Sequence, residues 1–140
     1  MTTTASRNTT TGTTYEAEVE NLLEEFSDHQ WASQVNVGAK RNGGKHYCDI
    51  VLNDEELISL KYQRVQGTAE EKIPFEFMKL QHAIDDHGYK SATIVLAGPD
   101  KAWKWKDYYL SEEFRAKMSS IYPDVRIISH TQFTQEYLYQ

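Results

Sequence analysis

Two adjacent strand patterns, separated by a short acidic turn, constrain the fold of this chain more than any other feature. Residues 47–52 and 57–62 are rich in apolar, β-branched and aromatic side chains, as strands of a packed sheet are. Residues 53–56 read Asn-Asp-Glu-Glu, which favours a tight turn between them. The resulting hairpin would bring Asp49 and Lys61 side by side. A carboxylate can hold a divalent cation, and a lysine can orient water and offset charge on a phosphate.

Each of these two residues also has an ordinary explanation when it is taken alone. An isolated aspartate in a strand is more often a turn or edge charge than a ligand. Lys61 lies in an otherwise apolar run, where a lysine must either reach solvent or meet a carboxylate. Their presence on paired strands favours the functional interpretation of both.

Length and composition indicate one globular domain. The chain has 140 residues, of which 39% are hydrophobic and 26% are charged. We expect the threonine-rich residues 1–13 to form a disordered arm and residues 14–140 to form a single domain. Apolar runs fall far short of the ~20 residues that cross a bilayer, and no secretory signal is visible, so no membrane partner is expected. The single cysteine, Cys48, excludes an internal disulfide and favours a reducing cytoplasm.

The remaining periodicity predicts alternating helices and strands, which indicates an α/β fold. The helix after the hairpin should begin at or just before Pro74 and end before Gly88. The expected helices span about 15–26, 74–87, 111–121 and 131–139, and the expected strands span 30–37, 47–52, 57–62, 91–97 and 125–129.

Two glutamates on the apolar faces of these helices are candidates for the same site. Glu16, on the first helix, could complement the helix dipole or point across at the hairpin. Glu76, on the helix after the hairpin, could satisfy amides of its own first turn or join a site beside the sheet. Glu71 is adequately explained as a helix cap.

A glutamate on the first helix, an aspartate on the second strand and a lysine on the third resemble the PD-(D/E)XK nuclease superfamily, over roughly residues 12–98. Cys48-Asp49 stands in place of Pro-Asp, and residues 59–61 stand in place of (D/E)-x-Lys. The resemblance implies a restriction-endonuclease-like αβββαβ core, with a mixed central sheet flanked by helices. It implies that acids hold Mg²⁺ at the scissile phosphate and that Lys61 positions or deprotonates water. Gln63 is similar to a glutamine beside the site in resolvase-like members.

Ser59 departs from the superfamily pattern, which has a carboxylate at that position. A hydroxyl is a poor ligand for a hard cation. In some restriction enzymes with Ser-x-Lys, the missing acid lies on the following helix. Glu76, fifteen residues after Lys61, is therefore the preferred replacement, and Glu71 is the second choice.

The net charge of −6 lowers the expectation of nucleic-acid binding without removing it, because binding depends on the local face that meets phosphate. The basic, glycine-rich loop 38–44 could follow a phosphate backbone. Residues 101–109 mix aromatic rings with lysines, a pattern typical of nucleic-acid surfaces and equally of a dimer contact. The expected nucleic-acid contacts are Lys40, Arg41, Lys45, Arg64, Lys72, Trp103, Lys104, Trp105 and Lys106.

We therefore expect a Mg²⁺-dependent endonuclease, in which Mn²⁺ can substitute, that cleaves double-stranded DNA with the site specificity of a homing or restriction enzyme. A small catalytic core has little surface for reading a long site, so a homodimer or homotetramer is expected, in a bacterial cell or a phage-infected host. The near alternative is a Holliday-junction resolvase, and the alternative of another class is a non-catalytic binding or assembly module on the same fold. The residues expected to carry catalysis are Glu16, Asp49, Lys61, Gln63 and Glu76, and those expected to bind metal are Asp49, Glu16, Glu76 and Glu71.

Overall fold

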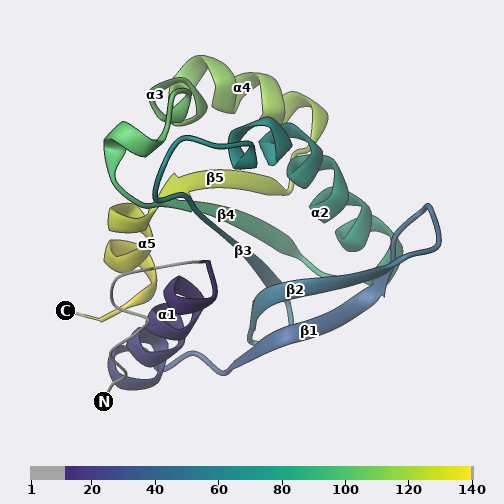
Figure 1. Cartoon of the computed structure of the whole chain (residues 1–140). Coiled ribbons are helices and arrows are strands. Elements are labelled where there is room, and N and C mark those ends of the chain that lie inside the picture. The colour runs from purple at the N-terminus through teal and green to yellow at the C-terminus, as the bar shows by residue number, and fades with distance from the viewer. Residues whose placement is uncertain (1–11, 140) are drawn as a thin grey trace.

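A five-stranded mixed sheet with helices on both faces is formed by residues 12–139, which the computed structural model describes (Figure 1). The predicted α/β class and the αβββαβ core are confirmed. The strands are β1 (Trp31–Ala39), β2 (Lys45–Leu52), β3 (Glu56–Tyr62), β4 (Ser91–Ala97) and β5 (Val125–Ser129), which lie across the sheet in that order. The helices are α1 (Gly12–Phe26), α2 (Ile73–His87), α3 (Lys106–Tyr109), α4 (Glu112–Ile121) and α5 (His130–Tyr137), with 3₁₀ turns η2 (Ala69–Lys72) and η3 (Asp100–Ala102).

Most of the expected arm, residues 1–13, lies outside the described residues. Gly12 and Thr13 belong to α1, so this helix begins earlier than the predicted residue 15. β1 lies slightly later than predicted, whereas β4 and β5 have the predicted bounds. The signals at the ends of α2 are confirmed: Pro74 lies in its first turn, and Gly88 caps its end with a left-handed φ of 82°.

The first three strands are antiparallel and the last three are parallel. The β2–β3 hairpin turns through Asn53 and Asp54, whose φ values of 54° and 60° are ones that these two residue types tolerate well. The parallel pairs require crossovers, which α2 supplies between β3 and β4, and α3 with α4 supply between β4 and β5.

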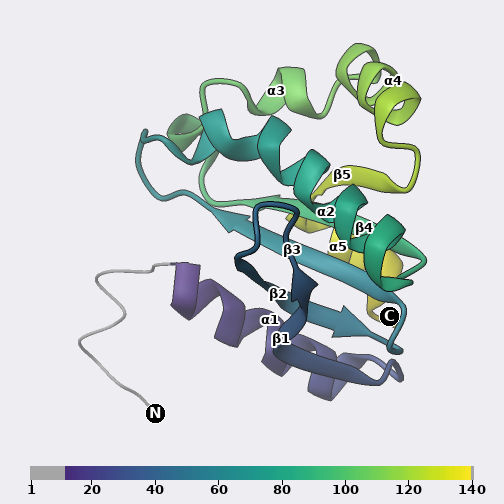
Figure 2. The ribbon, with the colours of Figure 1, turned by 90° about the vertical axis from the view of Figure 1, so that its right-hand side faces the viewer.

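Two apolar cores cover the two faces of the sheet. On one face, α2, α3 and α4 pack over the sheet, and on the other face lie α1 and α5 (Figures 1 and 2). The first core includes Ile73, Phe77 and Leu80 of α2, and the second includes Val19 of α1 and Phe133 of α5. Because both faces are covered, a polar side chain on a central strand must find a partner or an opening.

β2 and β3 separate part-way along their length. Their registered pairs run only from Leu52↔Glu56 to Ile50↔Ile58, and beyond that point the two strands diverge (Figure 1). The backbone of β3 past Ile58 therefore lacks β2 as a ladder partner, and polar groups at this fork need other acceptors. Asp49 and Lys61 both lie at this fork.

Among residues 12–139, no helix has the length and apolar character needed to cross a membrane.

Candidate active site

Asp49 is fixed at the fork by the backbone of the neighbouring strand. Its Oδ2 accepts a hydrogen bond of 2.7 Å from the amide of Leu60 on β3. This carboxylate thereby takes the place of the ladder partner that β2 no longer supplies. Burial raises the pKa of Asp49, although the Leu60 amide and Lys61 act in the opposite direction, and Glu76 raises the pKa further.

Glu16 reaches the same place from α1 on the other side. Its Oε1 accepts a hydrogen bond of 2.7 Å from the side-chain amide of Gln34, and the same nitrogen lies 3.4 Å from Oδ1 of Asp49. Burial raises the pKa of Glu16, and the nearby charge of Asp49 raises it further. Two carboxylates from different elements therefore converge on one N–H donor.

Gln34 is a site residue that the sequence reasoning missed. Its φ of 49° lies in the left-handed region, which is unusual for a non-glycine residue inside a strand. The flanking pairs Ser33↔Ile50 and Val35↔Cys48 place Gln34 opposite Asp49 in the β1–β2 register. The sequence could have indicated Gln34 only as a polar residue opposite Asp49 on the preceding strand. That inference requires the register of the β1–β2 hairpin, which the sequence does not fix because the length of the connecting loop is uncertain.

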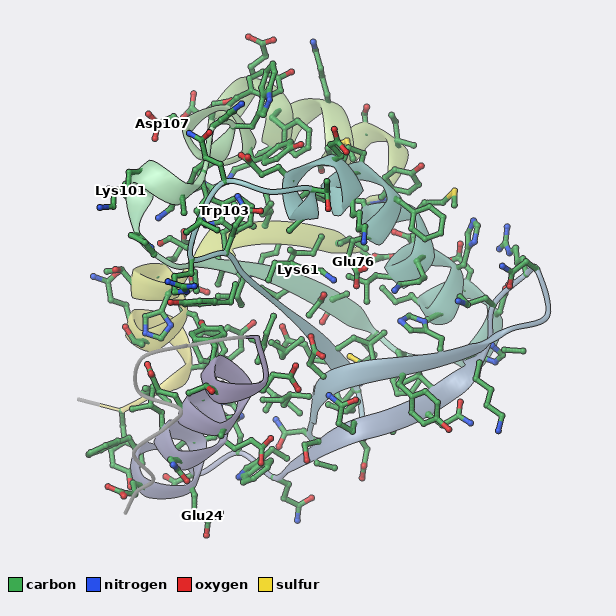
Figure 3. The ribbon with its side chains drawn as sticks, viewed as in Figure 1. Glu24, Lys61, Glu76, Lys101, Trp103 and Asp107 are labelled. Carbon is green, nitrogen blue, oxygen red and sulfur yellow. The ribbon has the colours of Figure 1, made fainter. Side chains whose placement is uncertain are left out.

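Lys61 and Glu76 form the second half of the site and point toward one another from β3 and α2 (Figure 3). The Lys61 Nζ lies 3.3 Å from Oε1 of Glu76, and the Nζ of Lys79 lies 3.1 Å from the same oxygen. The other oxygen, Oε2, accepts a hydrogen bond of 2.8 Å from the Ser59 hydroxyl. The residue at position 59, where a carboxylate was expected, thus holds a carboxylate that arrives from α2.

The charge of Glu76 is well compensated although its side chain is only 7% exposed. Burial opposes its ionisation, but Lys61, Lys79 and the Ser59 hydroxyl together hold the pKa of this carboxyl below its usual value. Glu76 is therefore ionised at neutral pH and fixes the Lys61 ammonium, whose charge also lowers the pKa of Asp49.

Gln63 and Glu71 lie apart from these contacts. The Gln63 amide donates to the carbonyl of Ala102 at 2.5 Å and lies 3.5 Å from Glu70, so it fixes the end of β3 to η3. Glu71 is exposed on η2, and it is the neighbouring Glu70 that is buried. Glu70 accepts a hydrogen bond of 2.6 Å from the backbone amide of Trp105. Gln63 therefore links β3 to η3 and forms no hydrogen bond with Asp49, Lys61 or Glu76 among the described residues. Of the two proposed replacements for the missing acid, Glu76 is the one in contact with Lys61.

The expected aromatic surface at residues 101–109 needs a correction. Trp103 is only 5% exposed, and its indole nitrogen donates to the carbonyl of Ala97, so it is a core residue and lies outside any nucleic-acid surface. Trp105 is exposed and makes an edge contact with Tyr108. The Lys106 ammonium is paired with Asp100 at 2.8 Å.

The other basic residues expected to contact nucleic acid lie at or near the surface. Arg41 is paired with Asp86, and its guanidinium makes bonds of 3.0 and 3.1 Å to the two carboxylate oxygens. Lys40 is half-buried in the same loop. The remaining four are exposed: Lys45, Arg64, Lys72 and Lys104.

The donor set at the fork suits a hard divalent cation. Within residues 12–139, no three His, Cys, Asp or Glu side chains are gathered into a ready-made metal centre. However, Glu16 and Asp49 present oxygen atoms to a single donor, the Gln34 amide, which stands in for positive charge between them. Burial raises the pKa of each carboxyl more than Lys61 and the hydrogen bonds lower it, and a bound cation would supply further compensation.

Comparison with known families decides the assignment of this fold and site. The PD-(D/E)XK nuclease superfamily domain matches residues 7–134, almost the whole chain. The chain belongs to the PD-(D/E)XK nuclease superfamily. No curated protein and no solved structure gives a significant match. Membership confirms the resemblance read from the sequence and makes phosphodiester hydrolysis the activity to test at the fork between β2 and β3.

Proposed function

We propose that this protein is a metal-dependent endonuclease that hydrolyses phosphodiester bonds of double-stranded DNA, with Mg²⁺ as cofactor and Mn²⁺ as a substitute. The observation that supports this most directly is the convergence of Glu16 and Asp49 on one donor at the fork. Lys61 reaches the same fork and is held by Glu76. A PD-(D/E)XK nuclease needs these two components, acids for a cation and an ammonium near the scissile phosphate.

Asp49 and Glu16 are the proposed metal ligands, since burial raises the pKa of both carboxyls and Lys61 offsets their charge only in part. Glu76 is the proposed third acid, in place of the one expected at Ser59. When bound, the divalent cation supplies Lewis-acid stabilisation of the negative charge that develops on the phosphate. The carboxyl groups must be ionised to bind it, so their raised pKa values predict weaker metal binding as the pH falls.

Lys61 is the proposed residue that orients the attacking water. Its ammonium carries three donors, of which the ion pair with Glu76 at 3.3 Å uses one. The other two can hold a water and a phosphate oxygen, and this fixed charge is preorganised for the transition state. In the reaction, the water oxygen bonds to phosphorus and releases a proton to solvent, the bond to the leaving sugar oxygen breaks, and that oxygen takes up a proton from solvent.

A homodimer or homotetramer is the proposed active form. One chain carries one such site, whereas a double-strand break requires the hydrolysis of two antiparallel strands. A two-fold axis would present one site to each strand, and it would also lengthen the surface available to recognise a specific sequence, as a homing or restriction enzyme requires.

Cleavage of supercoiled plasmid in Mg²⁺, in Mn²⁺ and in EDTA tests the proposal. Wild-type protein should nick or linearise the plasmid only with the metals, and Lys61→Ala should lose at least about a hundredfold of the rate. Lys117→Ala, which removes an exposed lysine of α4, is the matched control and should cleave normally. Cleavage confined to a four-way junction would instead indicate a resolvase. Binding of DNA without cleavage of any substrate would identify a non-catalytic module.

A further inference from the structure

A pocket of about 230 Å³ lies between α2 and the loop that joins β1 to β2. Figure 2 shows this loop rising beside α2. Two contacts hold the loop in place: the Arg41–Asp86 pair, and a hydrogen bond of 2.9 Å between the His87 ring and the carbonyl of Ala39. These contacts fix the loop that forms one wall of the pocket.

His46 lines this pocket and has an unsatisfied polar atom. The residue is only 4% exposed, and its Nε2 is buried and has no hydrogen-bond partner among the described residues. Burial, and then the charge of Lys79, lower the pKa of His46 to about 4, so the ring is neutral at neutral pH. A buried polar atom without a partner is unfavourable, and a ligand with a polar edge that reaches it would remove that cost.

An aromatic ring lies at the rim of the same pocket. Phe75 of α2 is 53% exposed although it lines the pocket, and Met78 lines it one turn away. An exposed phenylalanine face beside a pocket is a platform for a planar ring, and methionine makes favourable contacts with aromatic systems. These side chains thus provide a stacking surface, and His46 provides a hydrogen-bonding group.

Three lysine or arginine side chains and no acidic ones are among the described residues that line the pocket, and two of the three are paired with carboxylates just outside it. Lys40 and Arg41 lie on the loop side, and Lys79 lies on the helix side. Lys79 also links the pocket to the active site, because its Nζ is 3.1 Å from the Glu76 oxygen that Lys61 contacts. A polyanion held at the active site would therefore pass the mouth of the pocket.

We propose that this pocket receives one unstacked nucleobase of the polynucleotide whose phosphodiester lies at Asp49 and Lys61. The inference rests on the proposed function, since it assumes a nucleic-acid substrate. The volume is below the roughly 300–1,000 Å³ of sites for drug-sized ligands, which suits a single ring system. The base would stack on Phe75 and present a polar edge to His46 Nε2, while Lys40 and Lys79 meet the flanking phosphates.

This assignment predicts a preference for substrates with an unpaired base. Extruding a base from a duplex costs a few kcal/mol, and the cost is least where the base is mismatched or already single-stranded. The protein should therefore bind a duplex with a mismatch, or a single strand, more tightly than a perfectly paired duplex of equal length and charge.

Binding in EDTA tests the pocket without any cleavage. The probes are a single-stranded oligonucleotide of mixed sequence and an oligomer of the same length made of abasic sugar-phosphate units, each followed by fluorescence anisotropy. Wild-type protein should bind the first more tightly, and Phe75→Ala should lose about tenfold for the first and nothing for the second. Phe26→Ala, which removes an exposed phenylalanine of α1, is the matched control. Equal binding of both probes by the wild type, or equal affinities of the two variants, would overturn the proposal.

Two further readouts separate a failure of the pocket from a failure of the nuclease proposal. Phe75 is exposed, so Phe75→Ala should keep the wild-type Tm, and the ¹⁵N shift of His46 Nε2 should move only when the oligomer carrying bases is added. Base-dependent binding without plasmid cleavage would retain the pocket and reject the nuclease. Metal-dependent cleavage with base-independent binding would retain the nuclease and reject the pocket.

Discussion

Asp49 and Glu16 are placed where their own charge is unfavourable. Burial raises the pKa of both carboxyls, the charge of Asp49 raises the pKa of Glu16 further, and the Gln34 amide donates to both. Structural ion pairs normally lower the pKa of a carboxyl, as Lys61 and Lys79 do for Glu76. Carboxyl groups with raised pKa values at the fork between β2 and β3 are therefore better explained by a function than by stability.

Replacing Asp49 by Asn should raise stability and remove activity. Because the folded-state pKa of Asp49 is raised, folding favours the protonated form, and the ionised carboxyl costs stability above its folded pKa. That cost disappears as the pH falls below the unfolded value of about 3.9. Asp49→Asn keeps an oxygen for the Leu60 amide and should therefore show a higher Tm than wild type at neutral pH in EDTA, but not in acid. Its cleavage rate should fall at least about a hundredfold.

Thermal unfolding across a pH series checks this expectation, with Asp28→Asn as the control at an exposed aspartate. A Tm gain that is the same at all pH values, or that the control reproduces, would contradict the linkage to Asp49.

Gln34 has an unfavourable left-handed backbone conformation and a side-chain amide that contacts Glu16 and Asp49. Two substitutions separate the effects of the backbone and of the side chain. Gln34→Gly and Gln34→Ala both remove the amide between Glu16 and Asp49, so each should lower the cleavage rate by about tenfold. Glycine adopts the φ of 49° freely, whereas alanine does not, so the Gly variant should be more stable than the Ala variant by roughly 1 kcal/mol. Urea unfolding and plasmid cleavage measure the two effects. An alanine variant that cleaves at the wild-type rate would show that the amide has no part in the site.

At the scale of elements, the sequence predicts what depends on local periodicity and misses what depends on packing partners. The hairpin, α2 and β4 follow from apolar runs, Pro74 and Gly88, which are local signals. The early end of the β2–β3 ladder and the position of Gln34 depend on long-range register, which periodicity does not encode. Trp103 was predicted wrongly because an alternating Trp-Lys pattern does not distinguish an exposed surface from a segment whose tryptophan packs into the core. Trp103 directly follows the 3₁₀ turn η3, and its indole donates to the carbonyl of Ala97 at the end of β4.

Glu76 links α2 to β3 through Lys61 and Ser59, so its replacement should lower the free energy of unfolding. Glu76→Gln removes the carboxylate that pairs with both Lys61 and Lys79 in a largely buried position, which should cost about 2–3 kcal/mol. The folded-state pKa of Glu76 is lowered, so its contribution is present above the unfolded value of about 4.3 and is lost as the pH falls through the folded value.

The difference between wild type and Glu76→Gln should therefore be largest at neutral pH and shrink in acid, as measured by denaturant unfolding. Glu113→Gln breaks an exposed pair with Lys117 on α4 and should cost less than about 0.5 kcal/mol. Equal losses in the two variants would mean that Glu76 does not anchor α2.

At the scale of the whole molecule, the two faces of the sheet contribute different parts of one site. α1 contributes Glu16 from one face, and α2 contributes Glu76 from the other. Both act at the fork between β2 and β3, where Glu16 shares the Gln34 amide with Asp49 and Glu76 pairs with Lys61. A substitution that weakens the packing of α1 or α2 on the sheet should therefore displace Glu16 or Glu76, even where it makes no contact with Asp49. This arrangement also means that all of the proposed metal ligands and the proposed water-orienting lysine come from one chain.

Subunit mixing tests whether two such chains act together on one duplex. If the active form is a dimer with one site per strand, wild type mixed with excess Asp49→Asn will form heterodimers in which only one site works. These should nick plasmid and rarely linearise it, so the ratio of nicked to linear product should rise as the inactive chain is added. Gel analysis of the products at fixed wild-type concentration measures that ratio. If the chain acts as a monomer, the inactive variant should leave the product ratio unchanged, because each wild-type molecule would still make its cuts independently.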